Sequence, residues 1–168
     1  MISLPLPTTP QVLLTQCIRP ALLNVPAKMR DMRAEVQLVT TAMQESGLKH
    51  REQMGGGPAR SLWQFEKNGG CREVMTNTAT AHLAENVCDL LGVAFDLTTV
   101  FAVITTNDEL AACWARLNYW RSPLALPALG DAEAAWKLYK AVWAPGMPRK
   151  ETWAGYYQTA LEVVTKST

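Results

Sequence analysis

One carboxylate in this chain stands at a position suited to catalysis. Glu45 lies in the run Gln44-Glu45-Ser46-Gly47-Leu48, where an apolar helical pattern meets the glycine that stops it. A helix end holds a side chain rigidly at the rim of a pocket, which suits general acid and base catalysis. The carboxyl end of a helix carries partial negative charge, which favours the protonated form of a glutamate there. Glu45 is therefore the candidate catalytic residue, and a solvated surface carboxylate is the alternative.

A second polar side chain interrupts an apolar segment further on. Gln64 comes 19 residues after Glu45 and lies between Trp63 and Phe65. A carboxamide on such a segment is expected to face a polar groove, where it contacts a substrate or supports the glutamate. Four tryptophans offer aromatic faces that could stack on sugar rings, with core packing as the alternative for each, namely Trp63, Trp136, Trp143 and Trp153. Ser46 either holds Glu45 or forms a local bond within the helix end.

An amphipathic pattern predicts the helix that carries Glu45, over residues 27 to 46. Its buried face is marked by apolar residues three or four apart, namely Met32, Val36, Val39 and Met43. Pro26 marks the boundary before this helix, and Gly47 marks its end. Glu45 points about 200° around the helix from Met43, so we expect it to leave the core and face a cleft.

Capping residues and apolar spacing predict the remaining elements. Further helices are expected over residues 78 to 91, 96 to 104, 107 to 120 and 131 to 143. A first helix is expected to follow Thr9-Pro10, and Pro20 is expected to kink or restart it. Residues 48 to 75 contain the one short segment that fits an extended conformation. The predicted fold class is mainly α, with at most a small β-ribbon.

Length and composition predict one domain with a short extension. A chain of 168 residues that is 48% hydrophobic buries enough surface for a single unit over residues 9 to 168. Residues 1 to 8 are punctuated by prolines and are expected to form an extended arm. The 16 Lys and Arg nearly balance the 15 Asp and Glu, so no nucleic-acid partner is expected. No stretch approaches the roughly 20 apolar residues that span a membrane.

The N-terminal residues and the cysteines bear on localisation and cofactors. The first residues lack the charged opening and apolar run of a signal peptide, which predicts synthesis in the cytoplasm and export by another route. The chain has no Cys-x-x-Cys pair, and its four cysteines are widely spaced. Neither a metal site nor a cofactor is therefore expected.

Two segments together resemble the lytic transglycosylase and goose-type lysozyme group. Those enzymes commonly have Glu-Ser at a helix end, and about 18 residues later the end of a Gly-Ala-x-Gly-Leu-x-Gln run. Here the matching residues are Glu45-Ser46 and Ala59-x-Ser61-Leu62-Trp63-Gln64. The segment from Ala134 to Tyr139 resembles the late helix that supplies a tyrosine near the glutamate. Much of the carboxy-terminal half resembles small proteins of tailed phages and prophages.

The resemblance implies a lysozyme-like helical domain that acts on the glycan strands of peptidoglycan. Glu45 would be the only acid and base, because the substrate's own 6-hydroxyl closes on the anomeric carbon. Tyr139 or Tyr119 would lie near the reacting sugar. The implied substrate-binding residues are Ser46, Ser61, Trp63, Gln64, Tyr119 and Tyr139. A phage origin implies a virion-associated protein that reaches the cell wall by injection or through a holin.

Three alternatives to a transglycosylase stay open. A hydrolase would need a second carboxylate about 5 to 9 Å from Glu45, for which Glu52, Glu66 and Glu73 are candidates by proximity in sequence. An inactive structural or assembly protein of the virion or tail is favoured by Pro58 and Ser61, which replace the glycines of the family run.

In that structural role, the arm and residues 143 to 157 would dock to neighbouring virion or tail proteins. A small helical regulator is a third option, for which no motif is present.

Overall fold

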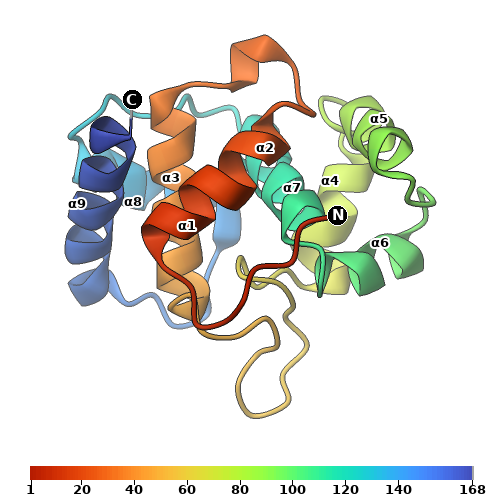
Figure 1. The fold of residues 1–168 in the computed structure, drawn as a ribbon, viewed down its shortest axis with the longest axis horizontal. Coiled ribbons are helices and arrows are strands. Elements are labelled where there is room, and N and C mark those ends of the chain that lie inside the picture. The colour runs from red at the N-terminus through yellow and green to blue at the C-terminus, as the bar shows by residue number, and fades with distance from the viewer. Residues whose placement is uncertain (168) are drawn as a thin grey trace.

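A central helix, α3 (Met32–Ser46), organises the structure, which is a computed structural model that describes residues 1–167. Helix α3 lies between α9 (Lys150–Lys166) on one side and α7 (Asp108–Trp120) on the other, with α1 (Pro10–Leu13) crossing it (Figure 1). Most of its residues after the first turn are buried, including polar ones such as Gln37. Its carboxyl end is therefore held in place by packing from several directions.

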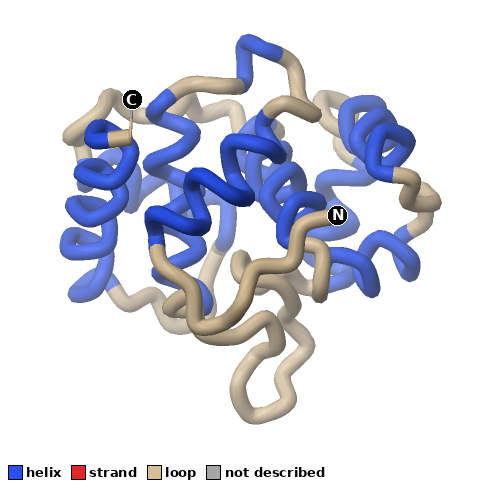
Figure 2. The backbone as a smooth tube through the Cα atoms, in the orientation of Figure 1, coloured by secondary structure: helices blue, strands red, loops and turns tan. Residues whose placement is uncertain are grey.

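The other elements surround this helix. The α-helices are α2 (Arg19–Leu22), α4 (Arg72–Thr76), α5 (Ala81–Leu91), α6 (Leu97–Ile104) and α8 (Ala132–Trp143). Two π-helical turns, η1 (Leu14–Ile18) and η3 (Lys67–Cys71), and one 3₁₀ turn, η2 (Ala27–Met29), connect them. Helices α4, α5 and α6 gather beside α7, at the end of the molecule away from α8 and α9 (Figures 1 and 2).

The mainly α class is confirmed. The structure is 61% helix, and within residues 1–167 the only β-type pairing consists of two isolated bridges, Glu52 with Arg60 and Arg60 with Phe65. The loop from residue 48 to residue 66 takes the place of the small ribbon that the sequence allowed. These bridges still fold the loop back on itself beside the end of α3 (Figure 2).

Helix α3 ends as expected but begins later than expected. Gly47 adopts a left-handed conformation, φ 59°, and its N–H donates to the carbonyl of Met43, which is a typical glycine stop. At the other end, Asp31 caps the helix by accepting from the N–H of Ala34 at 2.9 Å. The expected start at residue 27 is wrong, because the chain makes a separate 3₁₀ turn and then an extended residue, Arg30, before this cap.

Proline has the predicted effect on the first helix. Thr9 caps α1 and accepts from the N–H of Val12, with Pro10 as the first helical residue. The helix then passes through the π-helical turn η1 and resumes as α2, in which Pro20 is the second residue. A proline ring clashes with the carbonyl four residues earlier, and a π-helical turn accommodates that clash.

Helix α9 buries part of the segment that was expected to dock to neighbouring proteins. Its apolar face packs mainly on α3, and it buries Trp153, Tyr157, Ala160 and Val164. The proposed docking segment, residues 143 to 157, therefore places two of its aromatic side chains in the core. These side chains are not available as a free interface.

The N-terminal arm is also part of the packed structure. Leu4 is 5% exposed, its N–H donates to Oδ2 of Asp108 at 2.8 Å, and the carbonyl of Ile2 accepts from the N–H of Asp108. The arm runs across the ends of α3 and α7 to reach this carboxylate (Figure 1). The arm is therefore held against α7 and the loop after α3 through Ile2, Leu4 and Thr8.

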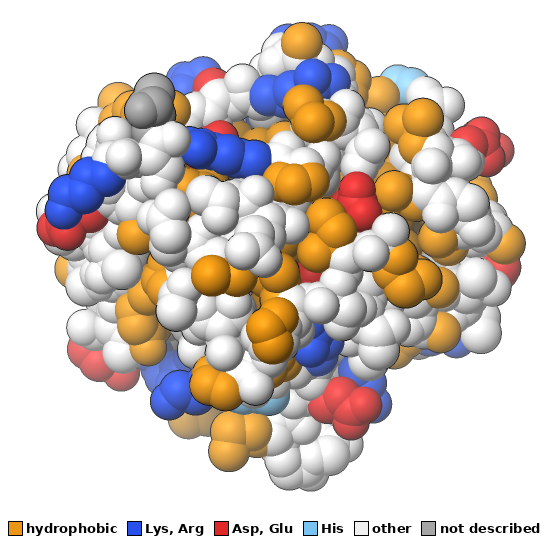
Figure 3. Space-filling view, viewed as in Figure 1, with side chains coloured by type: hydrophobic (Ala, Val, Ile, Leu, Met, Phe, Trp, Pro, Cys, Tyr) orange, Lys and Arg blue, Asp and Glu red, His pale blue; other side chains and the backbone are white. Residues whose placement is uncertain are grey.

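The surface matches the balanced charge of the sequence. On the face shown in Figure 3, acidic and basic side chains are interspersed and neither sign forms a continuous patch. Within residues 1–167, no helix combines the length and the hydropathy that a membrane crossing requires.

Candidate active site

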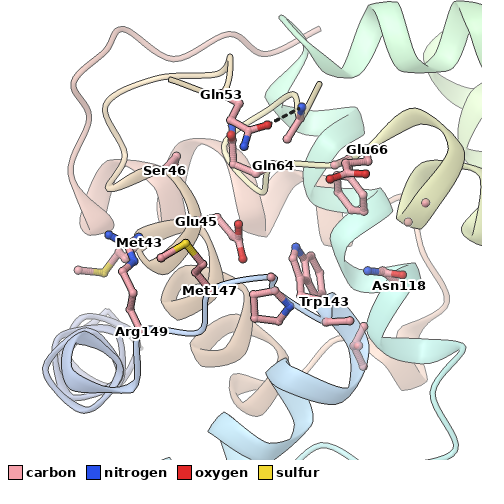
Figure 4. A pocket seen from close by; sticks show the side chains of 18 of the residues that line it. Met43, Glu45, Ser46, Gln53, Gln64, Glu66, Asn118, Trp143, Met147 and Arg149 are labelled. Carbon is pink, nitrogen blue, oxygen red and sulfur yellow. Dashed lines mark hydrogen bonds between the residues drawn. The ribbon is translucent and has the colours of Figure 1, made fainter. Parts of the chain in front are cut away.

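A groove of about 860 Å³ opens beside the carboxyl end of α3. Its walls come from the loop after α3, the segment around η3, one side of α7 and the residues from the end of α8 to the start of α9. Glu45, Gln64, Glu66 and Trp143 border it (Figure 4). A cleft of this volume lies in the range of ligand sites in enzymes.

Glu45 projects into this groove from the last turn of α3. Its side chain is partly buried, and the hydroxyl of Tyr139 donates to its Oε1 at 2.5 Å. The two residues are 94 positions apart in the sequence and come from α3 and α8. Glu45 is partly buried and borders the groove, the place that the sequence indicated for it.

The surroundings of Glu45 raise the pKa of its carboxyl above the ordinary value. Burial raises the pKa of Glu45 from its ordinary 4.5 to about 7. The hydrogen bond from Tyr139 and the positive charge of Arg149 oppose this shift, because both favour the carboxylate. At neutral pH the group therefore exists in both protonation states, which a residue that acts as acid and then as base requires.

Tyr139 is held rigidly by aromatic neighbours. Its ring stacks on Trp153 at a centroid distance of 4.8 Å and lies 5.4 Å from Trp136 and 6.4 Å from Trp143. Burial, followed by the charge of Glu45, raises the pKa of the Tyr139 hydroxyl far above its ordinary value. The hydroxyl therefore stays protonated and keeps donating to the carboxylate.

Gln64 lies in the groove as the sequence indicated. Its backbone has a φ of 52°, and its Nε2 donates to the carbonyl of Ser61 at 2.7 Å and to that of Arg51 at 3.4 Å. Its amide oxygen has no hydrogen-bond donor among residues 1–167 and can accept from a ligand hydroxyl.

Ser46 also borders the groove, but its hydroxyl is engaged locally. It donates to the carbonyl of Ala42 and accepts from the N–H of Leu48. The local bond within the helix end is thus the role that the geometry favours.

Four predicted substrate-binding residues lie in the core and do not line the groove, although the hydroxyl of one of them, Tyr139, reaches Glu45. Ser61 and Trp63 are fully buried, and the Trp63 indole donates to the carbonyl of Leu38 at 3.0 Å. The hydroxyl of Tyr119 is buried against α3, where it shares a hydrogen bond with Thr41 at 2.6 Å. These side chains pack behind the groove, because neighbouring elements cover α3 on nearly every side.

The candidate second carboxylates differ in their positions. Glu66 and Glu73 are exposed and border the groove, whereas Glu52 is exposed outside it. Glu73 forms an ion pair with Arg121. Glu66 borders the same groove as Glu45, and the two side chains are drawn apart from each other in Figure 4.

Asn118, Met147 and Arg149 border the groove and were not among the candidate residues, whereas Trp143 was a candidate for stacking on sugars. Trp143 and Asn118 carry polar groups there, and the Trp143 indole donates to the carbonyl of Trp63 at 2.9 Å. Met147 and Arg149 come from the segment between α8 and α9. Only the aromatic character of Trp143 was a signal in the sequence, because the others depend on how α8 and α9 pack.

No metal site is formed by the part of the chain that the structure describes, since no three His, Cys, Asp or Glu side chains there lie close enough together. All four cysteines are buried free thiols. Comparison with known protein families, with curated proteins and with solved structures finds no match. The chemistry of the groove is therefore inferred from its own residues.

Proposed function

We propose that this protein cleaves the glycan strands of peptidoglycan by a lytic transglycosylase-like reaction, with Glu45 as the acid and base. The observation that carries the proposal is a partly buried glutamate with a pKa of about 7 at a groove, hydrogen-bonded by a buried tyrosine. The resemblance of Glu45-Ser46 and of the run that ends at Gln64 to this group of enzymes supports the same chemistry.

The proposed reaction uses one carboxyl group twice. Protonated Glu45 donates its proton to the glycosidic oxygen as the bond to the anomeric carbon breaks. The resulting carboxylate then takes the proton of the sugar's own 6-hydroxyl, whose oxygen bonds to the anomeric carbon. The products are a free hydroxyl on the leaving sugar and a 1,6-anhydro ring, and no water is consumed. A pKa near neutrality suits both steps, because the same group must release and accept a proton.

A hydrolase is the nearer alternative, and Glu66 is the carboxylate it would use. An inverting hydrolase keeps its two carboxyl groups about 6.5 to 9.5 Å apart to leave room for water. Glu66 is exposed and has no ion-pair partner among residues 1–167, so no neighbouring charge holds it in a defined position. A partly buried, hydrogen-bonded carboxyl at Glu45 alone favours the transglycosylase.

We also propose that this protein is associated with the virion and acts at the bacterial cell wall. An inactive virion scaffold is the second alternative, but Leu4 of the arm and Trp153 and Tyr157 of the second docking segment are buried in the core. Their burial favours an enzyme over a scaffold that docks through these side chains.

Substitution of the glutamate tests the proposal. Glu45→Gln should lower the rate of glycan cleavage by about 10² to 10⁴, because the amide keeps the shape but cannot exchange a proton. Purified peptidoglycan is digested and the released sugars are weighed by mass spectrometry, where an anhydro end is lighter by one water than a reducing end. Glu66→Gln is the matched control and should retain activity with anhydro products.

Other outcomes point to other functions. Reducing ends, together with inactivity of Glu66→Gln, would identify a two-carboxylate hydrolase. Intact glycan after prolonged incubation with the wild-type protein would contradict the enzyme and leave the scaffold.

A further inference from the structure

A set of reciprocal hydrogen bonds joins the end of α3 to the start of α9, directly behind Glu45. Nε2 of Gln44 donates to the carbonyl of Arg149 at 2.9 Å, and Nη2 of Arg149 donates back to the carbonyl of Gln44 at 3.0 Å. The hydroxyl of Thr152 adds a hydrogen bond to Oε1 of Gln44 at 2.9 Å. Gln44 is 3% exposed, and both polar atoms of its side chain form hydrogen bonds within this contact. The residue before Glu45 is thus fixed at both its backbone and its side chain.

The same contact fixes a positive charge at the groove. Arg149 borders the groove on the side of α3 and lies close enough to Glu45 to act on its charge (Figure 4). Within residues 1–167, no Asp or Glu oxygen lies within 4 Å of its guanidinium, whereas Arg19, Arg33 and Arg51 each have such a partner. Its charge is therefore not neutralised locally and remains available to Glu45.

Few other groups act on this carboxyl. Tyr139 from α8 donates a hydrogen bond to it, and Tyr119 from α7 lies within electrostatic reach behind it. His50, in the loop after α3, borders the same groove. Of these neighbours, Arg149 is the permanent cation, because an arginine does not lose its proton in a protein.

We infer that Gln44 and Arg149 form a positioning pair for Glu45, in which Gln44 fixes the helix end and Arg149 stabilises the carboxylate that proton donation leaves behind. This inference rests on the proposed function for its catalytic meaning. Burial favours the neutral acid, and a cation outside hydrogen-bond range offsets part of that preference without locking the group as an ion pair would. The pair lets one carboxyl alternate between donor and acceptor.

Direct titration of Glu45 tests the electrostatic part without any substrate. The side-chain carboxyl of Glu45 is followed by ¹³C NMR from pH 4 to pH 9 in the wild type and in variants. Arg149→Gln should raise the pKa by about half a unit or more, because it removes the cation. Arg149→Lys, which retains the charge, should restore most of the wild-type value. Lys150→Gln removes a neighbouring cation that pairs with Glu133 outside the groove and should leave the pKa unchanged.

The activity profile gives a readout that a structural defect would not produce. A general acid must be protonated, so Arg149→Gln should move the alkaline limb of the kcat profile to higher pH. Thr152→Val should lower kcat by about threefold to tenfold with little change in KM, since near-attack geometry is sensitive to small displacements. Thr152→Ser keeps the hydroxyl and should restore kcat.

The outcomes separate the inference from the proposed function. An unchanged Glu45 pKa in Arg149→Gln, or an equal shift in Lys150→Gln, would overturn the role of Arg149. An active Thr152→Val enzyme with wild-type kcat would overturn the role of the Gln44 contact. If wild-type protein leaves glycan intact, the proposed function fails, and the titration still decides whether Arg149 acts on Glu45.

Discussion

At the scale of single residues, Glu45 is a largely buried carboxyl whose negative charge is only partly offset by its neighbours. Its carboxyl receives one hydrogen bond from Tyr139 and the distant charge of Arg149, whereas the buried carboxyl of Asp108 is met directly by Arg51. A buried carboxylate without a direct cation is costly, and the protein lowers that cost by keeping the proton. The same feature that suits catalysis should therefore reduce stability once Glu45 ionises.

The cost of ionising the buried carboxyl of Glu45 predicts that the effect of Glu45→Gln on stability depends on pH. The folded pKa of about 7 lies above the ordinary 4.5 of an unfolded chain, so the folded state binds the proton more tightly. The proton on Glu45 therefore stabilises the folded state, fully below pH 4.5, and this stabilisation is lost as the pH rises through 7. Glu45→Gln should therefore raise the free energy of unfolding at pH 8 by about 1 to 3 kcal/mol.

Urea unfolding at both ends of this range measures the effect. The variant and the wild type should differ little at pH 4.5 and most at pH 8. A difference that is the same at both pH values would show that Glu45 is not buried in the way the structure indicates.

At the scale of elements, an ion pair connects the groove loop to the helical body. The guanidinium of Arg51 donates to Oδ1 and Oδ2 of Asp108 at the start of α7, and to the carbonyl of Leu4 in the arm. The carbonyl of the same Arg51 accepts from the side chain of Gln64 in the groove. One arginine thus links the arm, the loop after α3 and α7, and its support reaches a groove residue.

Breaking this ion pair should destabilise the fold strongly. Asp108 is fully buried, so Asp108→Asn leaves the Arg51 charge without its partner and should cost about 3 to 5 kcal/mol of unfolding free energy. Asp96→Asn is the matched control: Asp96 caps α6 at an exposed position, and asparagine caps nearly as well. Chemical denaturation of both variants gives the comparison, and a similar small loss in each would contradict the central role of Asp108.

Helix α9 shows why an element can be missed. Trp153, Tyr157, Ala160 and Val164 follow the spacing of one helical face, and that face covers α3. The spacing is visible in the sequence, but aromatic residues with the same spacing also occur at exposed interfaces. Only the packing on α3 distinguishes a core face from a docking face.

At the scale of the whole molecule, the N-terminal arm closes the structure. The arm adds Leu4 to the core next to Asp108 and bonds to the loop after α3 through the N–H of Thr8 and the carbonyl of Leu48. Residues at opposite ends of the chain also meet, as Arg19 donates to the carbonyl of Ser167 at 2.8 Å. Contacts from segments near both ends of the chain therefore stabilise the fold that contains the groove.

Removal of the Leu4 side chain tests whether the arm is structural. Leu4→Ala should lower the free energy of unfolding by about 2 to 3 kcal/mol, the usual cost of a cavity at a buried leucine. Leu23→Ala, at a side chain that is 68% exposed, should change it by less than about 0.5 kcal/mol. Thermal unfolding of the two variants measures the difference, and equal melting temperatures would show that the arm is only loosely attached.

Local features of the fold could be predicted from the sequence because they depend on neighbours a few residues apart. Gly47 stops α3, and Asp96, Asn107 and Asp131 cap the helices that follow them, through hydrogen bonds to N–H groups three residues on. The position of Glu45 at a helix end followed from the same short-range rules. The late start of α3 was missed because Pro26 and Asp31 are both plausible beginnings, and the 3₁₀ turn between them gave no separate signal.

By itself, the sequence determined the helical class, the end of α3, and Glu45 and Gln64 as groove residues. Only the tertiary structure decided what surrounds that glutamate: Tyr139 is 94 residues away, and Arg149 meets Gln44 across 105. It also decided that Ser61, Trp63, Tyr119 and Tyr139 belong to the core. The physical reason is that helix caps and periodicity arise within one or two turns, whereas burial and the pKa of a carboxyl depend on which distant helices pack against it.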